Sequence, residues 1–248
     1  MDSYGEFAAV YDRLMDDFDY PAWAEYYIGL LTRCGIKPRK ICDCACGTGS
    51  MTIQFAKKGL TVTGVDLSRD MLEIAAVKAR RAAQKIMFTA QNMTELTLPR
   101  PVDAIVCACD GVNYLTDTDS LKKFFTAAFN GIKSGGCLAF DISSRYKLEK
   151  VIGNGFFGEE RDDVAYIWSN KLDEAQHTVD MDLTFFVKQE NGLYRRFEER
   201  HHQRAHSPEE IISALTECGF TEINTYGNMI YDAPASDDVR IHFTAKRP

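Results

Sequence analysis

The sequence predicts an α/β fold: a Rossmann-like, mostly parallel seven-stranded sheet flanked by helices, with an antiparallel β insertion after the fifth strand. Two observations carry this prediction. Between residues 39 and 142, short apolar strands alternate with segments of helical periodicity, which is typical of βαβ units in a parallel sheet. Between residues 153 and 206, apolar and polar residues alternate, as they do in antiparallel strands with one wet face.

The elements of the core follow in order along the chain. An N-terminal helical segment has apolar residues at helical spacing from Phe7 to Leu31. Strands are expected over residues 39–44, 60–65, 85–89, 102–108, 136–142, 221–227 and 239–245. Helices are expected near residues 50–58, 69–82 and 118–133. A last helix begins at Ser207 and ends at Cys218, because an N-cap serine, a proline and two acids open it and a glycine follows it.

The insertion contains three strand signals, at residues 164–168, 178–187 and 194–198. Asn191-Gly192 predicts a hairpin between the last two. We therefore expect residues 1–152 and 207–248 to form the core and residues 153–206 to form a separate antiparallel sheet.

Composition favours a cytoplasmic enzyme with one enlarged domain of 248 residues. The net charge of −7 argues against nucleic acid and against an anionic membrane surface. The chain has no run of eighteen apolar residues, and its first residues lack the features of a signal peptide. Eight cysteines are present without C-x2-C spacing, so we expect buried thiols, no metal and a reducing compartment.

Residues 43–49, D-C-A-C-G-T-G, connect an apolar strand to a helix. Gly47 and Gly49 let the backbone approach a ligand closely, and the following helix offers free N–H groups. A second acid, Asp66, comes 23 residues after Asp43, at the end of the next strand, where a carboxylate can hold a ribose hydroxyl. The pattern predicts a nucleoside-type cofactor at the carboxyl edge of the sheet.

A dinucleotide is disfavoured by two residues. Thr52 stands where the dinucleotide motif needs Gly or Ala, and Asp43 would repel a pyrophosphate. An acid at that place can instead hold an ammonium group. An NAD-dependent oxidoreductase therefore stays a weaker alternative.

The chain resembles the class I S-adenosylmethionine-dependent methyltransferases in four successive motifs. These are residues 43–49, V-D-L-S-R-D-M-L at 65–72, Q-N-M at 91–93 and C-D-G-V-N-Y-L at 109–115. The resemblance extends through L-A-F-D at 138–141 and covers residues 37–145 firmly.

The resemblance implies S-adenosylmethionine as cofactor and assigns residues to it. Asp43 would anchor its amino end, Asp66 its ribose, and Met93 would pack on adenine. Asn92 departs from the family, in which an Asp is common at this place. The full set of expected donor contacts is Tyr11, Trp23, Asp43, Ala45, Cys46, Gly47, Gly49, Asp66, Leu67, Met71, Asn92, Met93 and Cys109.

Asp110, Tyr114 and Tyr11 are the candidate catalytic residues. The first two follow the fourth strand, at the edge where open parallel sheets bind ligands, and Tyr11 lies on the N-terminal segment together with Tyr4. His201, His202 and His206 do not share one strand face, so a metal site is disfavoured. The polar face of the insertion is expected to carry Arg196, Glu198, Arg200, His202 and Arg204.

The predicted function is transfer of a methyl group to a small-molecule N, O or C acceptor by in-line displacement. Such a reaction needs alignment and exclusion of water more than it needs a covalent nucleophile. The insertion would be a lid over the acceptor, and the alternative is that it forms a subunit interface. The protein is expected to be a monomer or a homodimer. Methylation of tRNA or protein, and a non-catalytic cofactor-binding regulator, remain alternative functions.

Overall fold

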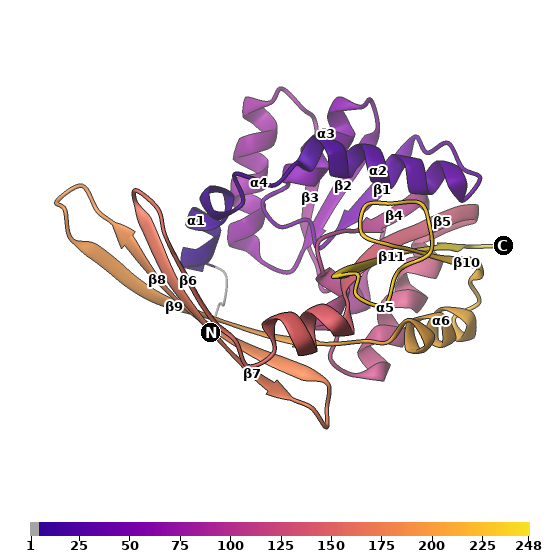
Figure 1. Cartoon of the computed structure of the whole chain (residues 1–248). Coiled ribbons are helices and arrows are strands. Elements are labelled where there is room, and N and C mark those ends of the chain that lie inside the picture. The colour runs from indigo at the N-terminus through magenta and orange to yellow at the C-terminus, as the bar shows by residue number, and fades with distance from the viewer. Residues whose placement is uncertain (1–4) are drawn as a thin grey trace.

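The computed structural model describes residues 5–248 and contains two sheets (Figure 1). The strands of the large sheet are β1 (Lys40–Cys44), β2 (Thr61–Asp66), β3 (Met87–Ala90), β4 (Val102–Cys107), β5 (Ile132–Ser143), β10 (Thr221–Tyr226) and β11 (Arg240–Lys246). Their order is β10-β11-β5-β4-β1-β2-β3. Strand β11 pairs antiparallel with both β10 and β5, and all other neighbouring strands of this sheet pair in parallel, which confirms the predicted fold.

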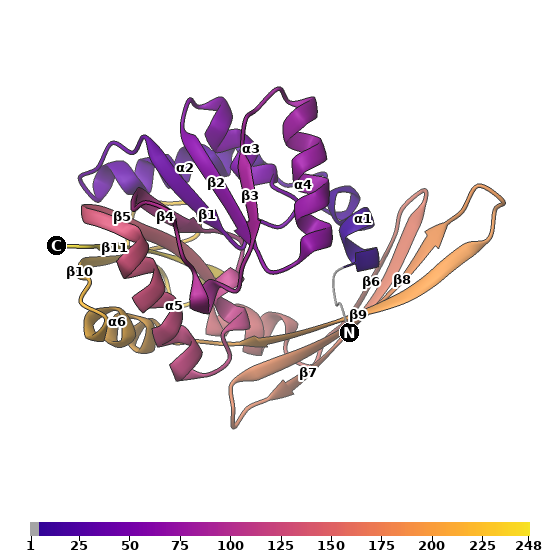
Figure 2. The same cartoon turned by 180° about the vertical axis from the view of Figure 1, so that it is seen from behind.

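Helices cover both faces of the large sheet. They are α1 (Gly5–Leu14), α2 (Tyr20–Arg33), α3 (Ser50–Lys57), α4 (Arg69–Arg81), α5 (Thr118–Gly131) and α6 (Pro208–Glu217). Helices α2, α3 and α4 lie on one face, and α5 and α6 lie on the other (Figure 2). None of the helices within residues 5–248 has the length and hydrophobicity needed to cross a bilayer.

Local sequence explains where the helices begin. Ser68, Asp117 and Ser207 each precede a helix, and each side chain accepts a hydrogen bond from a backbone N–H in the first turn. One face of the sheet then buries Phe124 and Phe125 of α5, and the other buries Tyr27 of α2. The apolar faces of these helices therefore fix their places on the sheet.

The insertion forms a four-stranded antiparallel sheet in the order β6-β7-β8-β9. Its strands are β6 (Phe156–Glu160), β7 (Val164–Asp173), β8 (Thr178–Lys188) and β9 (Tyr194–Arg204). The sequence prediction missed β6 and ended both β7 and β9 too early. This sheet projects from one end of the core, beside α1 (Figure 1).

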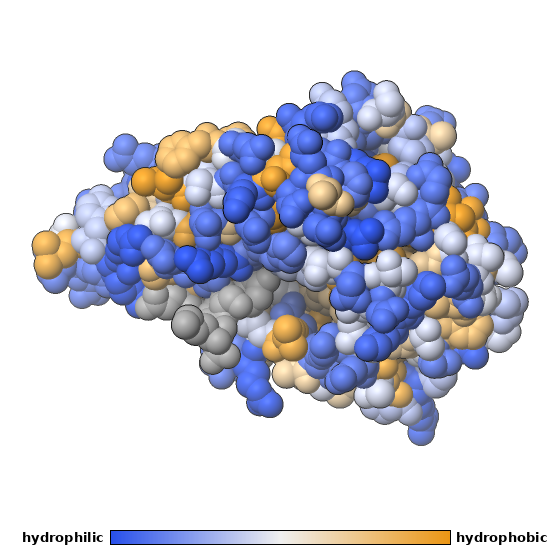
Figure 3. Space-filling model, turned by 90° about the horizontal axis from the view of Figure 1, so that it is seen from below, coloured by the Kyte–Doolittle hydropathy of each residue, from blue (hydrophilic) through white to orange (hydrophobic). Residues whose placement is uncertain are grey.

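The two faces of the insertion sheet differ in character. Phe185 and Phe197 on the inner face pack with Phe7 and Val10 of α1. On the outer face, His202 Nδ1 lies 2.6 Å from Asp180 Oδ1, and Arg200 pairs with Asp182 at 3.0 Å across the same two strands. Viewed from below, the molecule shows mostly hydrophilic side chains, and hydrophobic ones form small separate groups (Figure 3).

Asn113 joins the core to the insertion sheet. Its fully buried side chain donates to the carbonyl oxygens of Ser143 at 3.1 Å and Arg204 at 2.8 Å, and it accepts from the Ser143 N–H at 2.8 Å. Ser143 ends β5 and Arg204 ends β9, so one amide fixes the point where the insertion leaves and rejoins the core.

Asn113→Leu should lower the free energy of unfolding by about 2–4 kcal/mol, because it leaves three backbone groups without this buried partner. Urea denaturation measures the change. Asn130→Ala, at an exposed position on α5, is the control and should change stability by less than about 0.5 kcal/mol. A loss below about 1 kcal/mol in Asn113→Leu would contradict the assigned role.

Candidate functional site

The candidate site lies at the carboxyl edge of the large sheet. Strand β1 pairs in parallel with β2 and β4, with Cys44 beside Val65 and Asp43 beside Val106. Parallel strands end at the same edge, so the turn after β1, Asp66 of β2 and the residues after β4 come together there.

The turn after β1 has a strained backbone and leaves open space above it. Ala45, Gly47 and Gly49 have φ angles of 56°, 53° and 73°, in the left-handed region that favours glycine. A Cβ added to Gly47 would meet no protein atom within 4 Å, whereas one added to Gly49 would lie 2.9 Å from the Cβ of Ala75. Gly49 is therefore required by packing between helices, and Gly47 keeps room for a ligand.

Asp66 fixes the turn from the neighbouring strand. Its carboxylate accepts hydrogen bonds from the N–H groups of Gly47 at 2.7 Å and Ser68 at 2.9 Å. Burial raises the pKa of Asp66, and the backbone N–H groups oppose that shift.

Two adjoining cavities open at this edge. The larger, of about 480 Å³, is lined by the expected residues Tyr11, Ala45, Gly47, Asp66, Leu67, Met71, Asn92, Met93, Cys109 and Tyr114. The smaller, of about 70 Å³, is lined by the expected residues Tyr11, Asp43, Ala45, Cys46, Gly47 and Cys109. Tyr11, Ala45, Gly47 and Cys109 line both cavities, so they mark the junction between them.

Sequence reasoning missed several residues that line the cavities. Phe7 and His201 line the larger one, and Tyr20, Thr48 and Ser50 line the smaller one. Thr48 belongs to the motif of residues 43–49 and Ser50 follows it directly, so both could have been found from the motif. Tyr4, which sequence reasoning placed near the site, lies outside the described residues.

Asp43 is buried beside the smaller cavity. Its carboxylate accepts a hydrogen bond from Thr52 Oγ1 at 2.5 Å. Burial raises its pKa to about 7, and the Thr52 hydrogen bond partly opposes the rise. The threonine that argued against a dinucleotide motif thus orients this acid.

Helix α1 is held over the site by Asp12. The Asp12 carboxylate contacts Lys78 Nζ of α4 at 2.6 Å and accepts from Thr48 Oγ1 at 2.7 Å. Lys78 also donates to Ser50 Oγ at 2.6 Å. These contacts place the neighbouring Tyr11 against both cavities.

Asp110, predicted to be catalytic, is engaged in a buried ionic cluster. Its carboxylate pairs with Arg240 and lies 3.8 Å from Lys147 Nζ, and it lines neither cavity. Asp141 lies beneath it, where it pairs with the same arginine and accepts from Tyr27 Oη at 2.5 Å. The Asp110 carboxylate is therefore engaged by cations beside the cavities, and its catalytic role stays a prediction.

Asp141 also supports the backbone next to Asp110. Its carboxylate accepts the N–H groups of Cys109 at 2.8 Å and Asp110 at 3.1 Å. Both of those residues have left-handed φ angles, of 62° and 67°. This buried acid therefore holds a strained turn at the junction of the cavities.

Trp23 and Gly49 are two expected donor contacts that line neither cavity. Trp23 is buried in an aromatic cluster, where its ring centroid lies 5.6 Å from that of His242. The guanidinium of Arg240 lies 5.1 Å from the Trp23 ring centroid, on its face. Trp23 thus packs behind the ionic cluster.

The insertion supplies His201, and the side chains beside it in sequence point elsewhere. His202 lies on the outer face with Asp180, and His206 contacts the Leu115 carbonyl oxygen at 2.9 Å through Nε2. The polar face of the insertion, which carries His202, therefore lies away from the cavity. His201 Nδ1 lies 3.2 Å from Tyr114 Oη, and burial lowers the pKa of this histidine to about 4.

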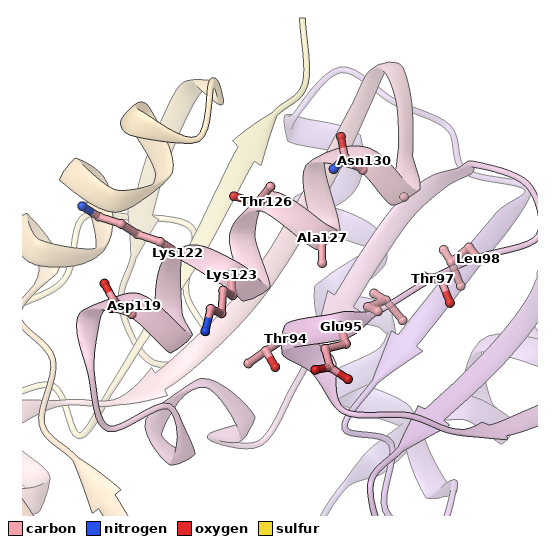
Figure 4. Close-up of a pocket in the computed structure, with 12 residues that line it drawn as sticks. Thr94, Glu95, Thr97, Leu98, Asp119, Lys122, Lys123, Thr126, Ala127 and Asn130 are labelled. Atoms are coloured by element: carbon pink, nitrogen blue, oxygen red, sulfur yellow. The ribbon is translucent and has the colours of Figure 1, made fainter.

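A groove of about 680 Å³ between α5 and residues 94–98 is larger than either cavity. Lys122 and Lys123 of α5 line it opposite Thr94 and Glu95 (Figure 4). Its walls lie away from the turn after β1 and contain both acidic and basic side chains. The cavities at the sheet edge, where the motifs converge, are therefore the candidate site.

Comparison with known proteins decides the family. A model described as a methyltransferase domain matches residues 41–136. Proteins named as methyltransferases in Geobacillus sp. (strain WCH70) and Bacillus subtilis (strain 168) are each 35% identical over 246 residues, covering 99% and 98% of this chain and 100% and 97% of theirs. The chain is a class I methyltransferase.

A solved structure agrees with this methyltransferase over nearly its whole length. An S-adenosylmethionine-dependent methyltransferase from Clostridium acetobutylicum ATCC 824 superposes with a TM-score of 0.88 at 34% identity, covering 98% of each chain. The methyltransferase therefore uses S-adenosylmethionine as its cofactor. Within residues 5–248, no group of three or more His, Cys, Asp or Glu side chains is arranged to hold a metal ion.

The pKa of Asp43 gives the methyltransferase a pH-dependent stability. Between the unfolded value of 3.8 and the folded value of about 7, the folded chain keeps a proton that the unfolded chain has lost. This contribution is complete below about pH 4 and disappears as the pH rises through about 7. In Asp43→Asn, the loss of stability between about pH 5 and pH 8 should shrink by on the order of 2 kcal/mol.

Urea denaturation at both pH values tests this expectation. Asp119→Asn, at an exposed position on α5, should keep the wild-type dependence. Some dependence should persist in Asp43→Asn, because burial also raises the pKa of Asp141 to about 7. An unchanged pH dependence in Asp43→Asn would show that the Asp43 carboxyl of the folded wild type is already ionised at about pH 5, which would contradict its raised pKa.

Proposed function

We propose that this methyltransferase moves a methyl group from S-adenosylmethionine to a small molecule held between its core and residues 153–206. The observation that carries the proposal is the junction of the two cavities. A donor with an amino-acid end and a nucleoside end needs two compartments and a connection between them. The two cavities share four wall residues at this edge of the sheet, which supports such a fit.

The amino-acid end of the donor fits the smaller cavity. Asp43 would receive its ammonium group, and the N-terminus of α3, which has no side-chain cap, would face its carboxylate. Thr48 and Ser50 add hydroxyl groups to the same walls. Both charges of the amino-acid end thus have partners.

The nucleoside end fits the larger cavity. Asp66 would accept the ribose hydroxyls while it keeps its two backbone hydrogen bonds, because a carboxylate has about four acceptor positions. Met71 and Met93 supply apolar surface for adenine, and Asn92 supplies an amide. The Asn92 oxygen already accepts from the Thr94 N–H at 3.0 Å, so this amide is held in place.

When bound, S-adenosylmethionine supplies an activated methyl group on a sulfonium. The residues of the junction, Tyr11, Ala45, Gly47 and Cys109, would surround that sulfonium and exclude water. Phe7, Tyr114 and His201 then form the part of the larger cavity that remains for an acceptor. The protein contributes chiefly alignment, which alone supplies several kcal/mol in reactions of this kind.

The chain segments that supply these wall residues support the proposal of a small-molecule acceptor. Phe7 belongs to α1, Tyr114 to the turn after β4 and His201 to β9, so three separate segments border the place. Residues 153–206 would act as a lid through the inner face of their sheet. The net charge of −7 gives no general attraction for nucleic acid.

Asp66→Ala should weaken binding of S-adenosylhomocysteine by about 1.5–3 kcal/mol, because it removes a charged hydrogen-bond acceptor from the ribose position. Calorimetry measures the affinity, and circular dichroism checks the fold. Glu73→Ala, at an exposed position on α4, is the matched control and should bind normally. Equal affinity in wild type and a folded Asp66→Ala would refute this placement of the nucleoside.

Donor carrying a deuterated methyl group, incubated with the enzyme and a cell extract, tests the acceptor class. The extract is separated afterwards into low-mass metabolites, RNA and protein. Label should enter the low-mass fraction and depend on intact Asp66. Enzyme-dependent label only in RNA or protein would overturn the small-molecule proposal.

A further inference from the structure

Lys78 of α4 makes three polar contacts beside the smaller cavity. Its Nζ lies 2.6 Å from Asp12 Oδ2, 2.6 Å from Ser50 Oγ and 3.1 Å from Thr48 Oγ1. An ammonium group has three hydrogens and no lone pair, so every hydrogen of Lys78 has an acceptor here. The cation is therefore held in one place, although Lys78 itself lines neither cavity.

The two hydroxyl groups of this network line the smaller cavity, but they differ in what they can still donate. Thr48 Oγ1 donates its hydrogen to Asp12 Oδ1 at 2.7 Å. Ser50 Oγ accepts from Lys78, and its own contact to Asp12 Oδ1 is 3.5 Å, which is long for a hydroxyl group. Ser50 is therefore the hydroxyl whose hydrogen can turn toward a ligand.

Tyr20 adds a second hydroxyl group next to Ser50 in the wall of the smaller cavity. The two side chains lie within hydrogen-bond reach of each other. A carboxylate is a stronger acceptor than a neutral phenol, so a ligand carboxylate in this cavity would take the Ser50 hydrogen from either of its present neighbours.

We propose that Lys78, held by Asp12, is a positioning residue that makes Ser50 a hydrogen-bond donor to the carboxylate of S-adenosylmethionine. The proposal rests on the proposed function, which places the amino-acid end in the smaller cavity, and it adds the group that recognises the carboxylate. Lys78 acts through Ser50, because it fills a lone pair of that hydroxyl and polarises the O–H bond. The consequence is a preference for ligands that carry the carboxylate.

Asp12 determines that this network orients a hydroxyl group rather than adding a net charge. Its carboxylate offsets the positive charge of Lys78. It also takes the Thr48 hydrogen, so the ammonium group and the hydroxyls adopt one set of donor and acceptor roles. Because a lysine cannot accept a hydrogen bond, Ser50 receives a hydrogen from Lys78 and keeps its own for another partner.

The simpler role for Lys78 is to attach α1 to the core. Helix α1 has other attachments, however. Val10 lies in one apolar cluster with Met71 of α4, and Arg13 pairs with Asp163 of the insertion. Loss of the Lys78 contacts should therefore leave α1 in place, and the two roles predict different binding results.

Two ligands that differ only in the carboxylate separate these roles. They are S-adenosylhomocysteine and its decarboxylated analogue, in which a hydrogen atom replaces the carboxylate and the ammonium group is retained. Calorimetry gives both affinities, and their ratio isolates the contribution of the carboxylate. The wild type should prefer S-adenosylhomocysteine by at least about tenfold, the scale of one hydrogen bond to a charged group.

Ser50→Ala should lower this preference by about tenfold, and Lys78→Met by about fivefold, because the hydroxyl remains but loses its orientation. The double variant should lose no more than Ser50→Ala alone, since Lys78 acts through Ser50. Lys78→Arg, which retains N–H donors, should keep part of the preference. Affinity for the decarboxylated analogue should stay within about twofold of wild type in every variant.

Lys57→Met is the matched control, because it makes the same change at an exposed position on α3. It should bind both ligands as the wild type does. Circular dichroism checks that each variant is folded.

Three results would overturn the proposal. One is an unchanged ratio in either Ser50→Ala or Lys78→Met. A second is an equal loss of both ligands in Lys78→Met, which would show that this residue only holds α1. The third is an additive loss in the double variant, which would show that Lys78 acts without Ser50. Label only in RNA or protein would overturn the small-molecule function and leave this proposal standing.

Discussion

The parallel pairing of β1 with β2 on one side and β4 on the other is the constraint on which the site depends. It brings the carboxyl ends of three strands to one edge, although Asp43, Asp66 and Cys109 are far apart in sequence. A shift of one residue in this register would turn Asp43 to the other face of the sheet. Both cavities exist because the register holds.

Buried acids stabilise strained turns on both sides of the junction. Asp66 accepts the Gly47 N–H from one side, and Asp141 accepts the N–H groups of Cys109 and Asp110 from the other. A left-handed non-glycine residue costs on the order of 1–3 kcal/mol, and charged hydrogen bonds of this kind are strong enough to offset it. The backbone is thus held open where a ligand must approach.

The acceptor side depends on contacts between segments distant in sequence. Asp12 fixes α1 to Lys78 of α4, and Asn113 fixes the end of β9 to the core. These two attachments place Tyr11 and His201 around one cavity. Desolvation by the resulting enclosure keeps the imidazole neutral, so packing decides the chemistry of this wall.

The sequence by itself determined the sheet, the donor motifs and the existence of the insertion, because these follow from local periodicity and from short contiguous patterns such as residues 43–49. It also indicated Tyr114 as a residue of the site, and Tyr114 lines the larger cavity. Only the tertiary structure decided that Asp110 pairs with Arg240, that Trp23 packs in the core and that His201 rather than His202 meets the cavity. Strand parity separates the two faces of a sheet, but it cannot say which face meets the core. That choice is made by long-range packing of α1 and β9, which no local pattern encodes.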